Sequence, residues 1–372
     1  MERHTYLTLL TPEDARTRWF TRIAELNAGP GEEYVPLSRA LHRTISRPVE
    51  ALRSSPAFHG AAMDGIAVRA ETTFMASTRA PLRLETGREA FWINTGHPLP
   101  EGTNAVIMVE NVNTEDEGRT VVIEKAAFPW QHVRKLGEDM VATEIILAPG
   151  TRIGPYEIGA MAAAGVMSPV FRLPEVAVIP SGSEIVPLAE AREEDLRAGR
   201  CLPEFNSLVF SALVDEAGGR ARTLPVVPDE PAAIAAAIRS AVEDGADLVI
   251  LNAGSSAGSH DYSADVIREM GELLVHGVAV MPGKPTALGV VRTSGREVPI
   301  IGTPGYPVSA IVAMEEFVMP LLALWQKHEA ARRESVEVFP CNPLPSRPGM
   351  EERVRVKLGR VDGSLYAVPL PR

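Results

Sequence analysis

The stretch Asp247–Ile267, DLVILNAGSSAGSHDYSADVI, joins an uncharged apolar run to a Gly/Ser-rich loop and then to a helical pattern. A short apolar run of this kind is typical of a strand buried on both faces of a parallel sheet. The loop glycines would let backbone N–H groups approach an anion at the start of the next helix. Alone, the loop is an equally good candidate for an ordinary strand-to-helix turn, so the rest of the chain must decide.

The same alternation of strand and helix continues on both sides of that stretch. Apolar runs at Val176–Ile179 and Pro299–Ile301 predict two further strands, and helices are predicted to begin near Asn206 and Pro307. Alternating β and α units predict a mostly parallel sheet covered on both faces, which binds ligands at the carboxyl ends of its strands. Residues 173–328 are therefore predicted to form a three-layer α/β domain.

The N-terminal part begins with a clear helix signal. Thr11-Pro12-Glu13-Asp14 supplies a cap, a proline at the first helical position and acidic residues in the first turn, and we expect the helix to end at Gly29. Its apolar stripe consists of Ala15, Trp19, Ile23 and Leu26. A second, Ala-rich helix is predicted at Tyr156–Val166.

Two segments have the short apolar runs and turn signals of β structure. Residues 48–138 predict a small β-rich domain, with Asp116–Arg119 as a hairpin turn. Residues 329–372 predict a truncated C-terminal β domain whose last two strands meet at Asp362-Gly363.

Composition excludes several classes of protein. The 372 residues include 37 Lys and Arg against 48 Asp and Glu, a net charge of −11, so no general attraction to nucleic acid or to an anionic membrane is expected. The two cysteines predict neither a disulfide framework nor a zinc site. The first residues lack the apolar core of a signal peptide, so we expect a cytoplasmic protein.

Three further loops concentrate glycine, proline and single charges after apolar runs. Met281–Pro285 presents Lys284, Gly302–Ser309 begins a helix, and Ile179–Glu184 ends a strand on a carboxylate. These loops predict a phosphorylated ligand, although a solvated lysine on a turn and a strand-to-helix connector are the simpler alternatives.

Glu184 and Asp261 are the candidate carboxylate ligands for a divalent cation such as magnesium. A fourth loop, Ala61–Ala67 in the β-rich region, holds Asp64, which by itself is more typical of a turn than of a catalyst. No nucleophile–base pair is visible in the sequence, so metal-assisted phosphoryl chemistry is the expected reaction class.

Six motifs, in order along nearly the whole chain, resemble the MoeA family of molybdopterin molybdenumtransferases, which also occurs as the E domain of gephyrin. They are AMDGIAV (Ala62–Val68), INTGHPLPEGTNAVIMVE (Ile93–Glu110), PSGSEIV (Pro180–Val186), GSHDY (Gly258–Tyr262), PGKP (Pro282–Pro285) and GTPGYPVSA (Gly302–Ala310). The resemblance implies a multi-domain α/β fold: a helical domain formed by residues 1–47 and 139–172, a β-rich domain of residues 48–138 inserted into it, a MogA-like α/β domain and a partial C-terminal β-barrel.

The resemblance also implies an activity and an assembly. The expected reaction is the magnesium-dependent insertion of molybdate into adenylated molybdopterin, with release of AMP, in molybdenum cofactor biosynthesis. The expected assembly is an elongated homodimer, whose cleft forms between the α/β domain of one subunit and the β-rich domain of the other. A MogA-like adenylyltransferase is the partner expected to supply the pterin nucleotide.

Residues are carried over from the family motifs position by position. The catalytic residues implied are Asp64, Thr95, Glu184, Asp261 and Lys284. Glu184 and Asp261 would also hold the magnesium ion. The substrate-binding residues implied are Asp229, Gly254, Ser255, Ser256, Gly258, Gly305, Pro307 and Ser309.

The sequence departs from the family pattern at several positions. Met281 stands where the family has the first lysine of KPGKP, and the chain stops at Arg372, before the segments that complete the last barrel. The motif sequences NAGSSAG and GYPVSA are similar to those of a branch of the family in which this unit is fused to a periplasmic-binding-protein-like domain. Two alternatives therefore stay open: a non-catalytic carrier of the cofactor and a MogA-like adenylyltransferase. The preference for molybdate or tungstate also stays open.

Overall fold

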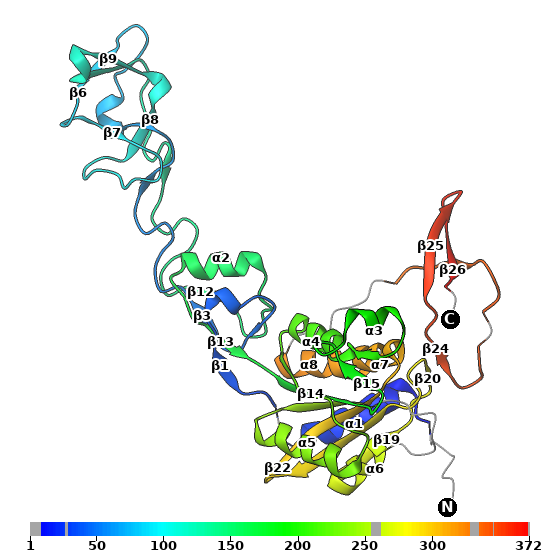
Figure 1. Ribbon diagram of the computed structural model, residues 1–372. Coiled ribbons are helices and arrows are strands. Elements are labelled where there is room, and N and C mark those ends of the chain that lie inside the picture. Colours follow the sequence, from blue (N-terminus) through cyan, green and yellow to red (C-terminus); the bar gives the residue numbers. More distant parts are fainter. Residues whose placement is uncertain (1–8, 27–28, 254–261, 328–334, 345, 371–372) are drawn as a thin grey trace, which may run out of the picture.

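The chain is elongated and consists of four regions in the computed structural model (Figure 1). The structure describes residues 9–26, 29–253, 262–327, 335–344 and 346–370. An α/β body lies at one end, and a β-rich arm stands away from it on a connecting region built around helix α2 (Pro155–Ala163). A C-terminal sheet lies on another side of the body.

The α/β body is built on a six-stranded sheet of order β17-β14-β18-β22-β21-β19. The first four strands run parallel, as predicted, whereas β21 and β19 are antiparallel. Ser294 and Gly295 join β21 to β22 with φ angles of 52° and 74°, which is the geometry of a tight hairpin and explains the antiparallel edge. The strands are β14 (Glu175–Ser181), β17 (Arg220–Thr223), β18 (Leu248–Ala253), β19 (Gly271–His276), β21 (Ala287–Thr293) and β22 (Arg296–Pro304).

Helices cover both faces of this sheet, so the predicted three layers are present. Alternate strand residues point to opposite sides: Val178 and Ile250 pack under one group of helices, and Ile179 and Leu251 under the other. The first face carries α1 (Pro12–Glu25), α4 (Asn206–Glu216), α7 (Pro307–Ala313) and α8 (Met319–Gln326), and the second carries α5 (Pro231–Glu243) and α6 (Tyr262–Met270).

The last helical stretch of the body is long and apolar. A π-helical segment, Met314–Val318, joins α7 to α8, and the resulting helix Pro307–Gln326 has the length and hydropathy of a membrane span. However, 61% of its apolar window is buried inside the protein, and Phe317 and Leu321 pack in the body's core. This stretch is therefore a core helix.

Helix α1 lies in a different place from the one predicted. Thr11 caps it by accepting a hydrogen bond from the Asp14 backbone, as expected, but it ends at Glu25, short of Gly29. Its buried stripe packs on the α/β body: the Trp19 indole donates to the Gly289 carbonyl at 2.9 Å. An amphipathic stripe predicts burial without naming the surface that covers it, which is why the grouping with the helical domain was wrong for this element.

The connecting region contains α2 and short strands around its own small core. That core includes Val35, Ile45, Ile153, Met161 and Phe171. Among the described residues of the region, α2 is the only α-helix, so it is less helical than expected. Its strands are β1 (Glu32–Tyr34), β2 (Thr44–Ile45), β3 (Val49–Glu50), β12 (Ile145–Leu147) and β13 (Val170–Arg172).

The arm consists of two three-stranded sheets and a short two-stranded pair. The Asp116–Gly118 turn joins β9 to β10 in an antiparallel pair, which confirms the predicted hairpin. The sheets contain β5 (Gly65–Val68), β7 (Ala90–Ile93) and β8 (Ala105–Met108), and then β6 (Leu82–Glu85), β9 (Val112–Glu115) and β10 (Thr120–Ile123); β4 (Gly60–Ala61) pairs with β11 (Val133–Arg134).

The C-terminal region forms an open sheet. Its order is β23-β26-β25, and β25 and β26 meet at the predicted Asp362-Gly363 turn. No closed barrel is formed by the described residues, so the expected partial barrel is not confirmed. The elements are β23 (Phe339–Pro340), β25 (Val356–Val361) and β26 (Ser364–Pro369), while β24 (Glu351–Glu352) pairs with β20 (Val280–Met281) of the body.

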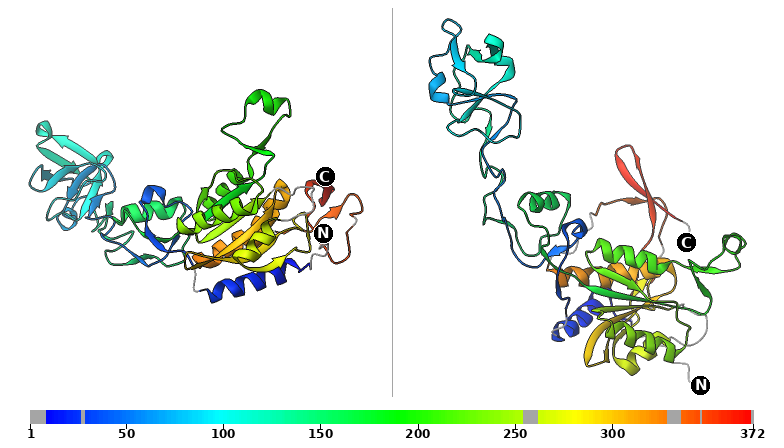
Figure 2. Two further views of the ribbon diagram at one scale, coloured as in Figure 1. Left: turned by 60° about the horizontal axis from the view of Figure 1, so that its bottom comes forward. Right: turned by 60° about the vertical axis from the view of Figure 1, so that its left-hand side comes forward.

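One excursion leaves the body near the ends of its strands. β15 (Ile185–Pro187) and β16 (Leu202–Glu204) form a parallel pair, and α3 (Glu193–Arg197) lies at the tip between them. Figure 2 shows this excursion projecting from the rest of the body.

Candidate functional site

A cavity of about 440 Å³ opens at the carboxyl ends of β14, β18 and β22. Parallel strands bring the residues that follow them to one edge of the sheet, which is where an α/β fold binds ligands. The excursion β15–β16 and the first turn of α4 complete the walls. The lining residues are Ser181, Glu184, Ile185, Leu202, Pro203, Glu204, Phe205, Asn206, Asn252, Gly305, Tyr306 and Pro307.

Two buried asparagines hold one wall of the cavity together. The Asn206 amide nitrogen donates to Asn252 Oδ1 at 3.0 Å and to the Gly305 carbonyl at 2.9 Å. The Asn252 amide nitrogen donates to Thr303 Oγ1 at 3.0 Å and to the Pro304 carbonyl at 3.1 Å. This network fixes the start of α4 against the ends of β18 and β22.

Two carboxylates near the cavity already have partners. The Glu204 carboxylate accepts hydrogen bonds from the Ser207 backbone N–H and hydroxyl. Asp229 accepts a hydrogen bond of 2.6 Å from the hydroxyl of Ser181, which lies at the end of β14. These contacts make Glu204 and Asp229 organisers of the wall.

The predicted residues of the body divide into three groups. Glu184, Gly305 and Pro307 line the cavity, and Asp229 reaches it through Ser181. Ser309 is nearly buried in the first turn of α7 and is not part of the lining. Gly254, Ser255, Ser256, Gly258 and Asp261 lie outside the described residues.

Lys284 lies on the turn between β20 and β21. Its backbone carbonyl accepts a hydrogen bond of 2.9 Å from Val278, and its side chain is exposed. Lys284 lines neither of the two cavities described here.

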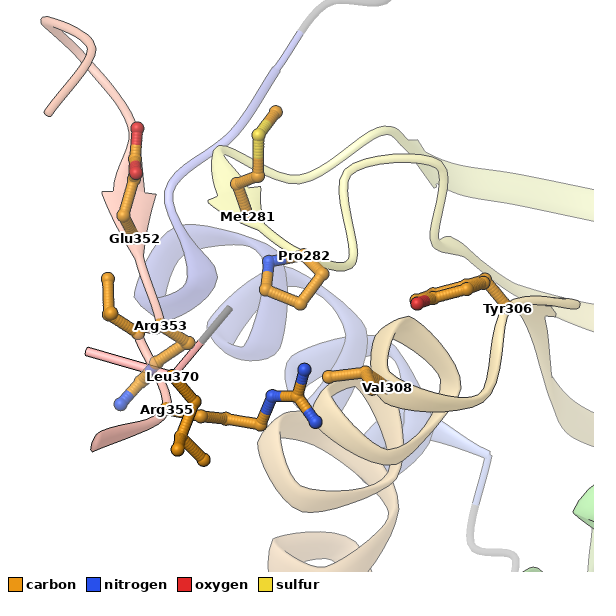
Figure 3. A pocket seen from close by; sticks show the side chains of 9 residues that line it. Met281, Pro282, Tyr306, Val308, Glu352, Arg353, Arg355 and Leu370 are labelled. Atoms are coloured by element: carbon orange, nitrogen blue, oxygen red, sulfur yellow. The ribbon is translucent and has the colours of Figure 1, made fainter. Parts of the chain in front are cut away.

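The second cavity, of about 230 Å³, adjoins the other end of the same loop (Figure 3). Met281, Pro282 and Tyr306 line it from the body, and the C-terminal segment supplies Arg353 and Arg355. Tyr306 also lines the first cavity, so the two cavities share one side chain.

A backbone hydrogen bond and two ion pairs fix the C-terminal segment that closes this second cavity. Arg353 N donates to the Met281 carbonyl at 2.8 Å, and the Arg353 guanidinium pairs with Glu316 at 2.6 Å and with Glu351. The cations around Met281 therefore come from the C-terminal segment, while Met281 itself presents an apolar side chain.

On the arm, Asp64 and Thr95 form a second polar centre. One Asp64 oxygen, Oδ1, accepts the Thr95 backbone N–H at 2.6 Å and the Thr95 hydroxyl at 2.8 Å. The pKa of Asp64 is lowered, first by the hydrogen bond from the Thr95 backbone and then by that from its hydroxyl. The sequence analysis named both residues, and the structure brings these two together.

The local backbone explains the Asp-Gly pair at this centre. Gly65 has φ of 157°, and a Cβ atom there would lie 1.9 Å from the Ile107 carbonyl oxygen. Only glycine lets β5 approach β8 this closely directly after Asp64. The Val109 N–H then donates to the Asp64 carbonyl at 3.0 Å, which fixes the backbone of the aspartate.

Within one chain the arm centre and the body cavity are separated. Asp64 directly precedes β5 and Thr95 follows β7, and Figure 1 shows the arm that contains these strands far from β14 and the other strands of the body, whose ends line the cavity. Residues at these two places can act on one ligand only if a second copy brings its arm to the cavity.

The described residues of the cavity supply part of a magnesium site. No group of three or more His, Cys, Asp or Glu side chains able to hold a metal is present among the described residues. Magnesium needs few protein ligands, since it keeps several waters and binds substrate phosphates, so the Glu184 carboxylate in the cavity wall is a suitable oxygen donor.

Sequence reasoning missed Asn206, Asn252 and Glu204. Asn252 had a usable signal, because a polar amide directly follows the buried run Leu248–Leu251. Asn206 was treated only as a helix start, and it does begin α4, although Phe205 occupies the cap position.

Comparisons with known proteins agree with this architecture. Residues 10–165 match the family model "MoeA N-terminal region (domain I and II)", and residues 177–324 match "Probable molybdopterin binding domain". Molybdopterin molybdenumtransferase 2 of Mycobacterium tuberculosis is 34% identical over 316 residues, covering 78% of this chain and 74% of that protein.

Two further relatives extend the comparison. The molybdopterin molybdenumtransferase of Haemophilus influenzae is 29% identical and covers 86% of this chain and 78% of its own length. The crystal structure of the molybdopterin biosynthesis MoeA protein from Pyrococcus horikoshii superposes with a TM-score of 0.67 at 29% identity. That superposition covers 98% of this chain and 90% of the other.

Proposed function

The chain belongs to the MoeA family of molybdopterin molybdenumtransferases, and from this premise we propose that it inserts molybdate into adenylated molybdopterin with release of AMP. It acts as a transferase in molybdenum cofactor biosynthesis, like the relatives of that name. The observation that carries the proposal is the cavity at the carboxyl ends of β14, β18 and β22, in the domain that matches the molybdopterin-binding family.

The cavity is proposed to bind the pterin nucleotide. Gly305 and Pro307 stand at the start of α7, where backbone N–H groups favour an anion, and Lys284 adds a flexible cation. Gly254, Ser255, Ser256 and Gly258 would contribute further backbone donors, Asp229 and Ser309 would complete the binding wall, and Asp261 would join Glu184 as a carboxylate ligand.

A magnesium ion held by Glu184 and Asp261 would draw negative charge from the phosphoanhydride that is to be broken. The side chains of the protein have the remaining tasks. Asn206 and Asn252 keep the wall rigid, and the excursion β15–β16 limits the access of water to the bound nucleotide.

Asp64 and Thr95 are proposed to act from the partner subunit of a homodimer. The two hydrogen bonds from Thr95 that lower the pKa of Asp64 favour its carboxylate form, and the Thr95 hydroxyl is already oriented by it. Placed over the partner's cavity, this pair would position molybdate or the attacked anhydride.

The direct test is AMP release from adenylated molybdopterin, with and without molybdate and magnesium. We expect release to need both ions and to be lost in Asp64→Ala and in Lys284→Ala. Lys125→Ala, which removes an exposed lysine of the arm, is the matched control and should keep full activity.

Mixing two inactive variants tests the shared site. If Asp64→Ala and Lys284→Ala subunits exchange, half of the dimers are mixed and each mixed dimer regains one intact cleft, so about a quarter of full activity should return. Activity that stays at the level of the separate variants after proven exchange would contradict a site shared between subunits.

A non-catalytic carrier of the cofactor is the second candidate, and Met281 is the observation that favours it. An apolar side chain in the second cavity leaves that loop with Lys284 as its single cation. A carrier would bind the pterin nucleotide tightly without releasing AMP, and Met281→Lys would then raise turnover. ATP-dependent adenylation of molybdopterin by the chain would instead indicate a MogA-like adenylyltransferase.

Three broader proposals accompany this function. We place the protein in the cytoplasm, and a MogA-like adenylyltransferase is the proposed source of its nucleotide. Apart from helix α1, which packs on the body, the domain limits proposed are 1–47 with 139–172, 48–138, 173–328 and 329–372.

A further inference from the structure

We infer that Arg43, assisted by Arg152, is a positioning residue that fixes the arm relative to the cavity by holding the C-terminal end of helix α4. The inference rests on the proposed function, because it concerns how the Asp64–Thr95 centre of the arm is positioned relative to the cavity on which it acts. It is carried by contacts that join the connecting region to α4.

The covalent connection alone would leave the arm free to swing. The chain crosses between the body and the connecting region at Gly31 and again at Leu173, and Leu173 N donates to the Gly31 carbonyl at 3.3 Å. The two crossings therefore lie side by side and form a single hinge between the body and the connecting region. Another contact is needed to set the angle about that hinge.

Arginines from the connecting region provide this contact at the end of α4. Arg43 Nη1 donates to the Gly218 carbonyl at 2.9 Å and also to the Gly219 carbonyl. Arg152 Nη2 donates to the Glu216 carbonyl at 2.5 Å. Glu216 is the last residue of α4, and a carbonyl there lacks a partner within the helix and carries partial negative charge, so a cation is favoured. Gly218 and Gly219 belong to the turn that directly follows the helix, so Arg43 holds the chain where it leaves α4.

Two further observations show how closely the surfaces meet. Gly218 has φ of 81°, and a Cβ atom there would lie 2.3 Å from the His42 carbonyl oxygen, so the connecting region touches the backbone of the turn. On the side of the body, Arg220 pairs with Glu33 of β1 at 2.9 Å. The contact is therefore made of directed polar bonds at a close approach.

Helix α4 joins this contact to the cavity. Its eleven residues span about 16 Å. Asn206 at its N-terminal end donates to Asn252 and to Gly305 in the cavity wall. A helix packed in a core moves as a rigid unit. The connecting region contacts one end of α4 and the cavity wall contacts the other, so α4 fixes the position of one relative to the other.

The first test measures distance and needs no enzyme activity. Spin labels are attached at Glu50→Cys in the connecting region and Arg239→Cys on α5, after Cys201→Ser and Cys341→Ser, and labelled protein is diluted with unlabelled protein. We expect Arg43→Ala to broaden the distance distribution. Arg53→Ala is the matched control, because Arg53 caps the Ala163 carbonyl at the end of α2 without leaving the connecting region.

The second test separates positioning from a general loss of structure. Arg43→Ala should lower kcat for AMP release roughly tenfold or more, because the Asp64–Thr95 centre is no longer held in position over the cavity. KM for adenylated molybdopterin should change little, because the cavity still binds the nucleotide. Arg43→Lys, which keeps one donor, should recover part of kcat. Arg53→Ala should leave both constants unchanged.

Each outcome bears on the inference. An unchanged distance distribution in Arg43→Ala would overturn it, even if activity fell. If Arg43→Ala does not fold by circular dichroism, Arg43→Lys and Arg152→Ala give the same comparison with one contact changed. If the parent protein shows no turnover, the proposed function fails, and the distance measurement still decides the role of Arg43.

Discussion

The cavity of the body and the Asp64–Thr95 centre of the arm organise polar groups in opposite ways. In the cavity wall, Asn206 and Asn252 are 8% and 4% exposed and depend on each other for partners. On the arm, Asp64 and Thr95 are both exposed, and two bonds from one residue hold the carboxylate. A buried network fixes geometry through the stability of the fold, whereas an exposed pair fixes it through local backbone shape.

The largest effect should come from breaking the buried network. Asn252→Ala removes one buried hydrogen bond each from the Asn206 amide, the Thr303 hydroxyl and the Pro304 carbonyl and leaves a small cavity, so the free energy of unfolding of the body should fall by about 2–4 kcal/mol. Hydrogen exchange measured on separate peptides of body and arm shows where stability is lost.

The matched control for that change is Asn113→Ala, an exposed asparagine on β9. It should alter exchange in neither region. Equal loss of protection in the arm and the body of Asn252→Ala would show that the two regions unfold together, and the comparison between them would then fail.

The next effect concerns the backbone of the arm. Gly65→Ala forces a Cβ atom against the Ile107 carbonyl and should destabilise the arm by about 1–3 kcal/mol, with loss of AMP release because Asp64 moves. Gly87→Ala is the control, since Gly87 also has a positive φ but has open space around its Cβ position. Similar losses in both variants would mean that backbone strain, and not the close approach of β8, is decisive.

Arg22 is intermediate in exposure between the buried asparagine network and the exposed Asp64–Thr95 pair. It is partly buried and pairs with Glu272 at 3.0 Å and Glu297 at 2.9 Å, which attaches α1 to the edge of the sheet. Arg22→Ala should lower the free energy of unfolding by about 0.5–1.5 kcal/mol, and less at high salt, because the pairs are partly exposed. Urea unfolding at two salt concentrations measures this, and a salt-independent loss would assign the effect to packing.

The smallest effect on stability is expected at the exposed pair. Thr95→Val removes the hydroxyl donor, so the pKa of Asp64 should rise toward its ordinary value, but only in part, because the Thr95 backbone N–H is the larger cause of the lowering. NMR titration of the Asp64 carboxyl group measures the shift directly.

The pH dependence of this pair has a definite sign. Folding lowers the pKa of Asp64, so the pair stabilises the folded arm above the pKa of the unfolded chain and loses that contribution as pH falls through the folded value. Thr95→Val should reduce this acid-sensitive contribution. An unchanged pKa in the variant would mean that the hydroxyl bond is not formed in solution.

Sequence patterns predicted the strands and helices of the body well because long apolar runs and helix signals mark them. The runs near Val176 and Pro299 became β14 and β22, and Thr11 did cap the first helix. The strand β5 was not predicted, because the glycine and the small residues of Ala61–Ala67 were interpreted as a loop, whereas Gly65–Val68 form a strand that is buried throughout.

Spatial relations were harder to predict than elements. The stripe containing Trp19 predicted burial but not the covering surface, which is the sheet of the body. The Ser294-Gly295 turn could have predicted the antiparallel edge. At the site, Asp64 and Thr95 came from the family resemblance, while the network of Asn206 and Asn252 depends on a contact between positions 46 residues apart.

The place of helix α1 also has a consequence for synthesis on the ribosome. Trp19 contacts Gly289, which is 270 positions later in the chain. At roughly 5–20 residues per second, α1 leaves the ribosome on the order of 15–50 s before the strand that it covers. During that interval its apolar stripe has no native partner, so α1 stays exposed until the strand that it covers has been synthesised.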